Sequence, residues 1–241
     1  MTAPDVAAAN GGLAVLTGVS RRGQVGEVVA RTLGEAGYIL ALLDRDGVEA
    51  EARAAELRDA GLRATAHACD LTDADALGAV AASLATVHSG GARALVCLAG
   101  GFGGGTVADT DLAMWQKMIA INLTTAHLTT RAFLPMLRAA RGSIVYFASA
   151  AVTPGESGKG ITAYAAAKAG VATLMRAVAD EERGAGVRAN ALAPTAIRTA
   201  ANTSTMRDST VYVERETVAG WVKYLCAPES GPISGQLIKI G

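Results

Sequence analysis

The sequence predicts an α/β protein built on a doubly wound sheet of about seven parallel strands. Short apolar runs alternate with alanine-rich segments of helical periodicity along the whole chain. This alternation favours parallel strands joined by crossover helices that cover both faces of the sheet. Of the 241 residues, 51% are hydrophobic and only 4% are aromatic, which suits buried strands packed under alanine-rich helices.

Seven apolar runs are expected to form strands, and six periodic segments are expected to form helices. The strands are residues 13–16, 38–43, 63–69, 94–98, 143–147, 187–192 and 237–240. The helices are residues 26–36, 48–60, 74–88, 109–140, 164–183 and 217–225, of which the fourth contains Pro135. No linker or repeat divides the chain, so we expect one domain over residues 1–241, with residues 1–10 flexible.

Composition argues against several classes of partner. The 22 basic residues balance the 22 acidic ones and form no basic block, so we expect no nucleic-acid or membrane partner. Cys69, Cys97 and Cys226 lack the spacing of metal ligands, and we expect them to be reduced, buried and inert, with no metal site. The first residues read as neither a signal peptide nor a membrane span, which predicts a soluble cytoplasmic protein.

The turn after the first expected strand is rich in glycine and reads Thr17-Gly-Val-Ser-Arg-Arg-Gly-Gln-Val-Gly26. Glycine lets the backbone approach a phosphate closely, and the helix that follows presents free N–H groups and a positive dipole end. A glycine-rich turn between a first strand and an amphipathic helix favours a dinucleotide site. The alternative is a turn that is merely flexible.

The second expected strand is followed by Asp44. A carboxylate at this position can accept hydrogen bonds from the hydroxyls of the adenosine ribose and would repel a 2′-phosphate, so it favours NAD over NADP. Arg21, Arg22 and Arg45 leave NADP open, because guanidinium groups near that point could bind the additional phosphate.

Tyr164 and Lys168 open an expected helix, four residues apart. Residues at this spacing lie on one face of a helix, so the phenol and the ammonium should point the same way. A nearby cation lowers the pKa of a phenol and prepares it for proton transfer. Taken alone, such a pair is more often an ordinary feature of a helix surface.

Taken together, the glycine-rich turn, Asp44 and the Tyr164/Lys168 pair resemble the short-chain dehydrogenase/reductase (SDR) family over residues 11–241. The resemblance implies a Rossmann-like fold and an NAD(P)-dependent oxidoreductase that transfers hydride between nicotinamide and a carbonyl or alcohol substrate. It assigns Tyr164 as general acid/base and Lys168 as the cation that lowers its pKa and binds the nicotinamide ribose. It assigns Ser149 as a donor to the substrate oxygen and Asn122 as the member that completes a proton relay.

The same resemblance implies a set of residues that bind the cofactor. They are Gly18, Ser20, Arg21, Gly23, Gln24, Val25, Gly26, Asp44, Arg45, Asp70, Leu71, Ala99, Gly100, Gly101, Tyr164, Lys168, Pro194, Thr195, Ile197 and Thr199. Three departures accompany them: the glycine turn is two residues longer than the family pattern, Cys97-Leu98 replaces two asparagines, and Thr195 replaces a glycine. Asp70 has a second interpretation as the cap of a helix before Ala74.

The substrate is expected between residues 101–105, 150–162 and 200–208, the last of them a small, polar and mobile lid. Gly100-Gly-Phe-Gly-Gly is similar to a segment of dihydropteridine reductases, but Ser149 favours a ketone or alcohol. A 3-oxoacyl thioester reductase and a non-catalytic NAD(P)-binding sensor or scaffold remain as alternatives. By analogy with the family, we expect a homodimer or homotetramer.

Overall fold

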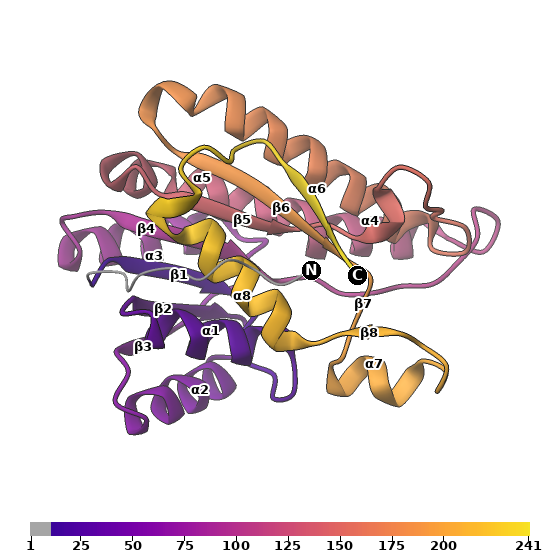
Figure 1. Cartoon of the computed structure of the whole chain (residues 1–241), viewed down its shortest axis with the longest axis horizontal. Coiled ribbons are helices and arrows are strands. Elements are labelled where there is room, and N and C mark those ends of the chain that lie inside the picture. The colour runs from indigo at the N-terminus through magenta and orange to yellow at the C-terminus, as the bar shows by residue number, and fades with distance from the viewer. Residues whose placement is uncertain (1–10) are drawn as a thin grey trace.

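The protein is built on a seven-stranded sheet in which every strand is parallel to its neighbours, in the order β3-β2-β1-β4-β5-β6-β9 (Figure 1). The computed structural model describes residues 11–241, so the expected flexibility of residues 1–10 lies outside the described residues. The predicted α/β doubly wound fold is confirmed, and each expected strand is present within two residues of its predicted ends. The strands are β1 (Leu13–Thr17), β2 (Ile39–Asp44), β3 (Ala64–Ala68), β4 (Ala92–Cys97), β5 (Ser143–Phe147), β6 (Arg188–Pro194) and β9 (Leu237–Ile240).

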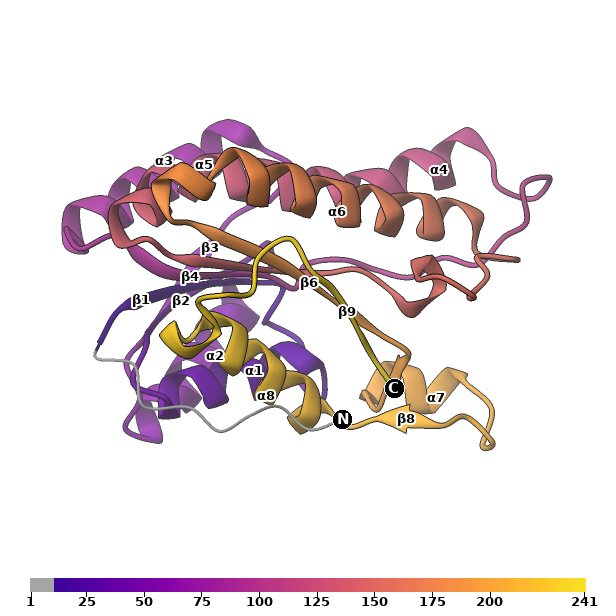
Figure 2. The ribbon, with the colours of Figure 1, turned by 45° about the horizontal axis from the view of Figure 1, so that its top comes forward.

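Helices cover both faces of this sheet (Figure 2). One layer contains α1 (Val25–Glu35), α2 (Gly47–Asp59) and α8 (Arg215–Cys226). The other contains α3 (Ala74–Val87), α4 (Leu112–Ile119), α5 (Thr125–Ala140) and α6 (Thr162–Glu181). Side chains alternate along β1, so that Leu13 and Val15 join one hydrophobic core while Ala14 and Leu16 join the other.

The helix predicted over residues 109–140 differs from the structure in two ways. It begins at Leu112, because the Asp111 carboxylate caps it by accepting a hydrogen bond of 2.7 Å from the Met114 N–H. Between α4 and α5 the chain makes a π-helical turn, Ala120–Thr124, which contains Asn122. Such turns are frequent at functional sites, and this one carries a predicted catalytic residue.

Several short elements were absent from the sequence prediction. Three 3₁₀ turns occur, as do helix α7 (Ala200–Thr205) and a second small sheet of β7 (Ala196–Ile197) and β8 (Tyr212–Val213). The segment 200–208, expected to be a mobile lid, therefore begins as a helix, because the Thr199 hydroxyl accepts from the Asn202 N–H at 3.2 Å and caps it. The mobility of this lid stays a prediction.

The three cysteines are buried and unpaired, as expected. Burial raises the pKa of the Cys97 and Cys226 thiols to about 12, which keeps both thiols protonated and unreactive near neutral pH. Among residues 11–241, no helix is both long and apolar enough to span a membrane.

Candidate active site

Tyr164 and Lys168 lie one turn apart near the start of α6, on the same face, as the spacing predicts. The Lys168 Nζ atom is 5.7 Å from the centroid of the Tyr164 ring. Only 6% of Lys168 is exposed, and its Nζ donates a hydrogen bond of 2.7 Å to the carbonyl oxygen of Phe147 at the end of β5. A buried ammonium is therefore held directly beside a phenol.

Burial shifts the pKa values of both members of this pair. Burial raises the pKa of the Tyr164 phenol, and a side-chain hydrogen bond with Ser149 lowers it. Burial also lowers the pKa of Lys168 to about 8. In this structure the Lys168 ammonium is directed at the Phe147 carbonyl, and the effect that opposes burial of the phenol comes from Ser149. That Lys168 lowers the pKa of Tyr164 stays a prediction.

Ser149 lies two residues after the end of β5 and stands at the start of a 3₁₀ turn, where its Oγ accepts from the Ala151 N–H at 3.3 Å. On another side of the phenol, the Phe102 ring meets the Tyr164 ring edge to face, with centroids 5.2 Å apart. Phe102 is 66% exposed, which leaves an apolar surface beside the phenol. Periodicity could not predict this contact, because Phe102 lies in a loop between glycines.

Asn122 is buried, and its amide is committed to the loop after β4. Its Oδ1 accepts from the Gly101 N–H at 3.2 Å, while its Nδ2 donates to the carbonyl oxygens of Gly101 at 3.0 Å and Met118 at 3.1 Å. A Cβ atom at Gly100 would lie 2.6 Å from the Asn122 Oδ1 and 3.6 Å from the Lys168 Nζ. Asn122 and Lys168 therefore converge on one point, which only glycine leaves open.

The glycine-rich turn has the features of a phosphate cradle. Gly18 has φ +69°, and a Cβ there would lie 2.6 Å from the Ala99 backbone, while a Cβ at Gly26 would lie 2.9 Å from the Gly18 oxygen. Gln24 occupies the N-cap position of α1 and makes no capping hydrogen bond with its side chain, unlike the aspartates that cap α2, α3 and α4. The N–H groups at the start of α1 are thus uncapped, and the turn fits the pyrophosphate of a dinucleotide.

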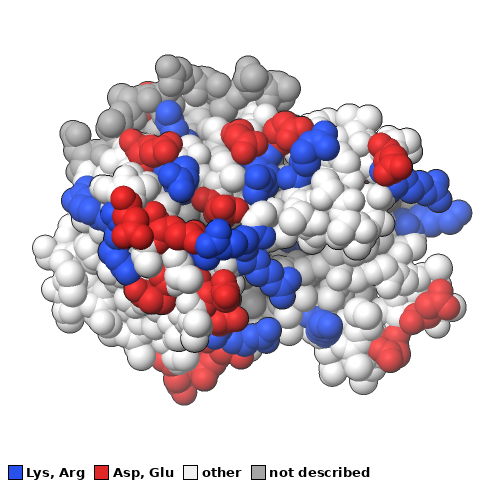
Figure 3. Space-filling model, turned by 90° about the horizontal axis from the view of Figure 1, so that it is seen from below, with Lys and Arg blue, Asp and Glu red and all other residues white. Residues whose placement is uncertain are grey.

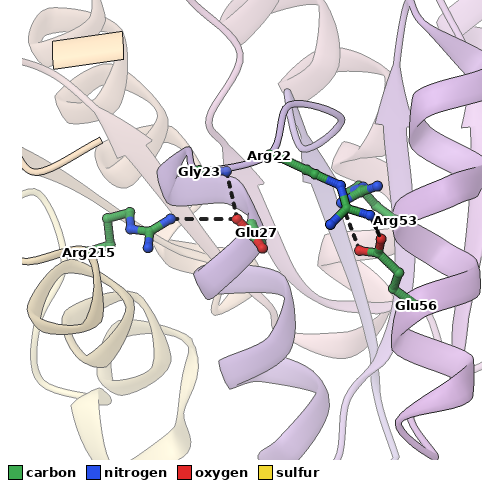
Figure 4. Close-up of polar contacts among 6 residues, drawn as sticks. All are labelled: Arg22, Gly23, Glu27, Arg53, Glu56 and Arg215. Atoms are coloured by element: carbon green, nitrogen blue, oxygen red, sulfur yellow. Dashed lines mark hydrogen bonds and ion pairs between the residues drawn. The ribbon is translucent and has the colours of Figure 1, made fainter. Parts of the chain in front are cut away.

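The longer glycine turn makes contacts beyond the cofactor site. The Gly23 oxygen accepts from the Ala200 N–H at 2.9 Å, at the first residue of α7. The Gly23 N–H donates to the Glu27 Oε2 at 2.8 Å, and the same carboxylate pairs with Arg215 of α8 at 3.5 Å (Figure 4). The turn is therefore fixed between α1, α8 and the expected lid.

Asp44 ends β2 and faces this turn, as predicted. Its Oδ2 accepts from the Ser20 N–H at 3.1 Å, and its Oδ1 accepts from the Asp46 N–H at 3.3 Å. A cavity of about 880 Å³ opens here, bordered by Ser20, Arg21, Arg22, Asp44, Arg45, Asp46, Gly47, Glu49, Ala52 and Arg53. The carboxylate that favours NAD and the arginines that favour NADP thus share one cavity.

Asp70 does not cap α3, so its second interpretation is wrong. The cap is Asp73, which accepts from the N–H groups of Asp75 and Ala76 at 2.9 and 3.0 Å. The Asp70 Oδ1 instead accepts from the N–H and the hydroxyl of Thr72, and these bonds lower the pKa of Asp70. Asp70 and the buried Leu71 remain predicted contacts of the adenine ring.

The remaining predicted residues follow β4 and β6, the strands on either side of β5, at the same edge of the sheet. Ala99, Gly100 and Gly101 follow β4, while Pro194, Thr195, Ile197 and Thr199 end or follow β6. In an open parallel sheet, ligands bind outside the carboxyl ends of the strands. The structure thus brings the predicted cofactor and catalytic residues to one edge.

Comparison with known proteins agrees with this geometry. The family model described as short chain dehydrogenase matches residues 13–210. The chain belongs to the short-chain dehydrogenase family. It is an NAD(P)-dependent oxidoreductase that acts on alcohol or carbonyl groups.

Three similar proteins illustrate the range of this family. A protein of Xanthobacter autotrophicus named inactive 2-(S)-hydroxypropyl-CoM dehydrogenase 2 is 39% identical, over 69% of this chain and 70% of its own. A galactitol 2-dehydrogenase of Rhizobium johnstonii is 34% identical, over 79% of this chain and 73% of its own. A crystal structure from Beutenbergia cavernae with NADP bound at low occupancy is 28% identical, has a TM-score of 0.85 and covers 96% of each chain.

Proposed function

We propose that this SDR is an NAD-dependent dehydrogenase of small secondary alcohols that also reduces the corresponding ketones. The observation that carries the proposal is the grouping of Tyr164 with Ser149 and the buried Lys168 beside an open glycine cradle. The substrate class is supported by similar proteins named for galactitol and for 2-(S)-hydroxypropyl-CoM. The residues of the site do not require a pterin-reductase or an acyl-thioester-reductase activity.

Bound NAD would supply the hydride acceptor, held by the turn Gly18–Gly26 and by Asp44. Tyr164 would take the proton of the alcohol, or give a proton to the ketone oxygen in the reverse direction. Ser149 would donate to the same oxygen, where negative charge develops during the reaction. The Ser149 side chain lowers the pKa of the phenol, which supports a position of both hydroxyls next to one substrate oxygen.

Lys168 and Asn122 would support the phenol from behind. The ammonium of Lys168 lies 5.7 Å from the Tyr164 ring, where it would stabilise negative charge on the phenol, and it would also bind the nicotinamide ribose. Asn122 holds the backbone of Gly101 with its amide, and it shares the point next to Gly100 with Lys168. We assign Asn122 the role of keeping this side of the site open for a proton relay.

The preference for NAD is proposed from Asp44, whose carboxylate faces the glycine turn. Ser20, Arg21, Gly23, Gln24, Val25, Gly26 and Arg45 would complete the adenosine and pyrophosphate site, and Pro194, Thr195, Ile197 and Thr199 would contact the nicotinamide side. By family analogy, we further propose a cytoplasmic homodimer or homotetramer. Size-exclusion chromatography with light scattering tests the oligomer.

The test is the formation of NADH from NAD by purified protein with a panel of secondary alcohols and polyols. Quinonoid pterins and 3-oxoacyl thioesters are offered with NADH as comparison substrates. We expect alcohol oxidation that accelerates as pH rises, because burial raises the pKa of Tyr164 and oxidation needs the phenolate. Tight NADH binding without turnover across the whole panel would contradict the proposal and favour a sensor.

A further inference from the structure

We propose that Glu56 of α2 is a second residue that sets the cofactor preference of this enzyme. Its carboxylate pairs with the guanidinium groups of Arg22 and Arg53. Both groups border the adenosine cavity and would otherwise bind the 2′-phosphate of NADP. The inference rests on the proposed use of NAD and adds to it a residue that lies outside the cofactor-binding turn and outside β2.

Glu56 stands between two arginines that come from different elements (Figure 4). Arg22 of the glycine turn donates its Nη2 to the Glu56 Oε1. Arg53, one turn earlier on α2, places its Nη1 2.7 Å from the Glu56 Oε2. One carboxylate thus uses both of its oxygens to hold two guanidinium groups.

Arg53 is the unusual member of this triad. Its side chain is only 6% exposed, whereas that of Arg22 is 68% exposed. The contact of Arg53 with Glu56 is close but not aligned as a hydrogen bond, so the buried Nε and Nη1 of Arg53 have no hydrogen-bond partner. Buried guanidinium N–H groups are costly to leave unpaired, so without the carboxylate of Glu56 Arg53 would be a ready donor to an anion in the cavity.

The charges around the cavity explain why Glu56 matters. Four arginines and three carboxylates border it; they are Arg21, Arg22, Arg45, Arg53, Asp44, Asp46 and Glu49. Glu56 lies behind them and supplies the fourth carboxylate, which brings the group to neutrality. Figure 3 shows acidic and basic side chains interleaved over the face that contains α2. Without Glu56, the cavity would have one excess positive charge and two available guanidinium groups.

Asp44 alone does not account for the arginines. It accepts from the backbone N–H groups of Ser20 and Asp46, and it makes no ion pair with Arg21, Arg22, Arg45 or Arg53 in the described part of the chain. An enzyme with this lining and without Glu56 would present both a ribose acceptor and a phosphate site. Glu56 therefore provides the charge that removes the phosphate site.

The test measures dissociation constants of NADH and NADPH by calorimetry for the wild type, Glu56→Gln and Glu51→Gln. Glu51 is a matched control on the same helix, because it pairs with Arg58 and does not border the cavity. We expect the wild type to prefer NADH. In Glu56→Gln, the NADPH-to-NADH ratio of dissociation constants should fall about tenfold, equal to roughly 1.4 kcal/mol. In Glu51→Gln the ratio should change less than twofold.

Two additional variants identify the arginines. When Arg22→Gln is added to Glu56→Gln, the NADPH-to-NADH ratio of dissociation constants should return most of the way to its wild-type value. If Glu56→Gln does not fold, the double variant Glu56→Gln/Arg53→Met removes the buried charge that the first change leaves unpaired. This double variant should still lower the ratio relative to the wild type, because Arg22 stays available to the 2′-phosphate. An unchanged ratio in folded Glu56 variants, or a wild type that binds NADPH as tightly as NADH, overturns the inference while NADH binding stands. Failure of both cofactors to bind would overturn the proposed function as well.

Discussion

Replacing Lys168 with methionine should stabilise the protein at neutral pH while it removes catalysis. Lys168 is buried, and its pKa falls from the ordinary 10.5 to about 8 in the folded protein. Below pH 8 both the folded and the unfolded chain hold the proton, so the folded state bears the full cost of a buried charge. Between pH 8 and 10.5 the folded chain releases its proton first, so stability rises with pH.

This difference in pKa corresponds to about 3 kcal/mol of unfolding free energy at pH 7 and about 1 kcal/mol at pH 10. Methionine fills a similar volume without a charge, but it leaves the Phe147 oxygen without its donor, which costs about 1–2 kcal/mol. We therefore expect Lys168→Met to gain about 1–2 kcal/mol at pH 7. That advantage should shrink by about 2 kcal/mol at pH 10.

Urea unfolding of wild type and Lys168→Met at pH 7 and pH 10 measures this change directly. The cost of the Phe147 oxygen cancels in the comparison between the two pH values. Lys117→Met, at an exposed position on α4, is the control and should show no such dependence on pH. A Lys168→Met variant that is less stable than the wild type by the same amount at both pH values would refute the reasoning.

Two other substitutions test local packing. Gly100→Ala places a Cβ 2.6 Å from the Asn122 Oδ1, so kcat should fall at least about tenfold. The control Gly78→Ala meets open space on α3 and should leave kinetics unchanged. Normal turnover in Gly100→Ala would contradict the role of Asn122. Thr129→Val removes a buried hydroxyl that lacks a partner and should raise the unfolding free energy by about 1 kcal/mol. Thr130→Val removes a hydroxyl bonded to the Ala126 oxygen and Tyr146, so it should lower the unfolding free energy. Equal effects of Thr129→Val and Thr130→Val would count against this account.

The fold could be predicted because its signals are local. The inner strands of the sheet are short apolar runs whose side chains are buried on both faces, as for β1, where all five residues are buried. The edge strands β3 and β9 are only partly buried. The grouping of Tyr164 and Lys168 follows equally from helical spacing. These features depend on residues close together in the sequence.

The features that could not be predicted from the sequence depend on contacts between residues far apart in it. Arg22 and Glu56 are separated by 34 positions, and their ion pair exists only because the glycine turn lies against α2. The pKa of Tyr164 depends on burial and on Ser149, and neither could be measured from spacing. Similarly, the π-helical turn at Asn122 arises where that amide bonds the backbone of Gly101. That Asp73 and not Asp70 caps α3 depends on side-chain geometry.

The most direct test of the central claim is Tyr164→Phe. This change removes the phenolic oxygen and keeps the ring that meets Phe102. Turnover of any alcohol or ketone that the wild type accepts should fall by a factor of about 10² or more, because the general acid/base is lost. The dissociation constant of NADH should change less than about threefold. Turnover close to that of the wild type would contradict the assignment of Tyr164 as the proton-transfer residue.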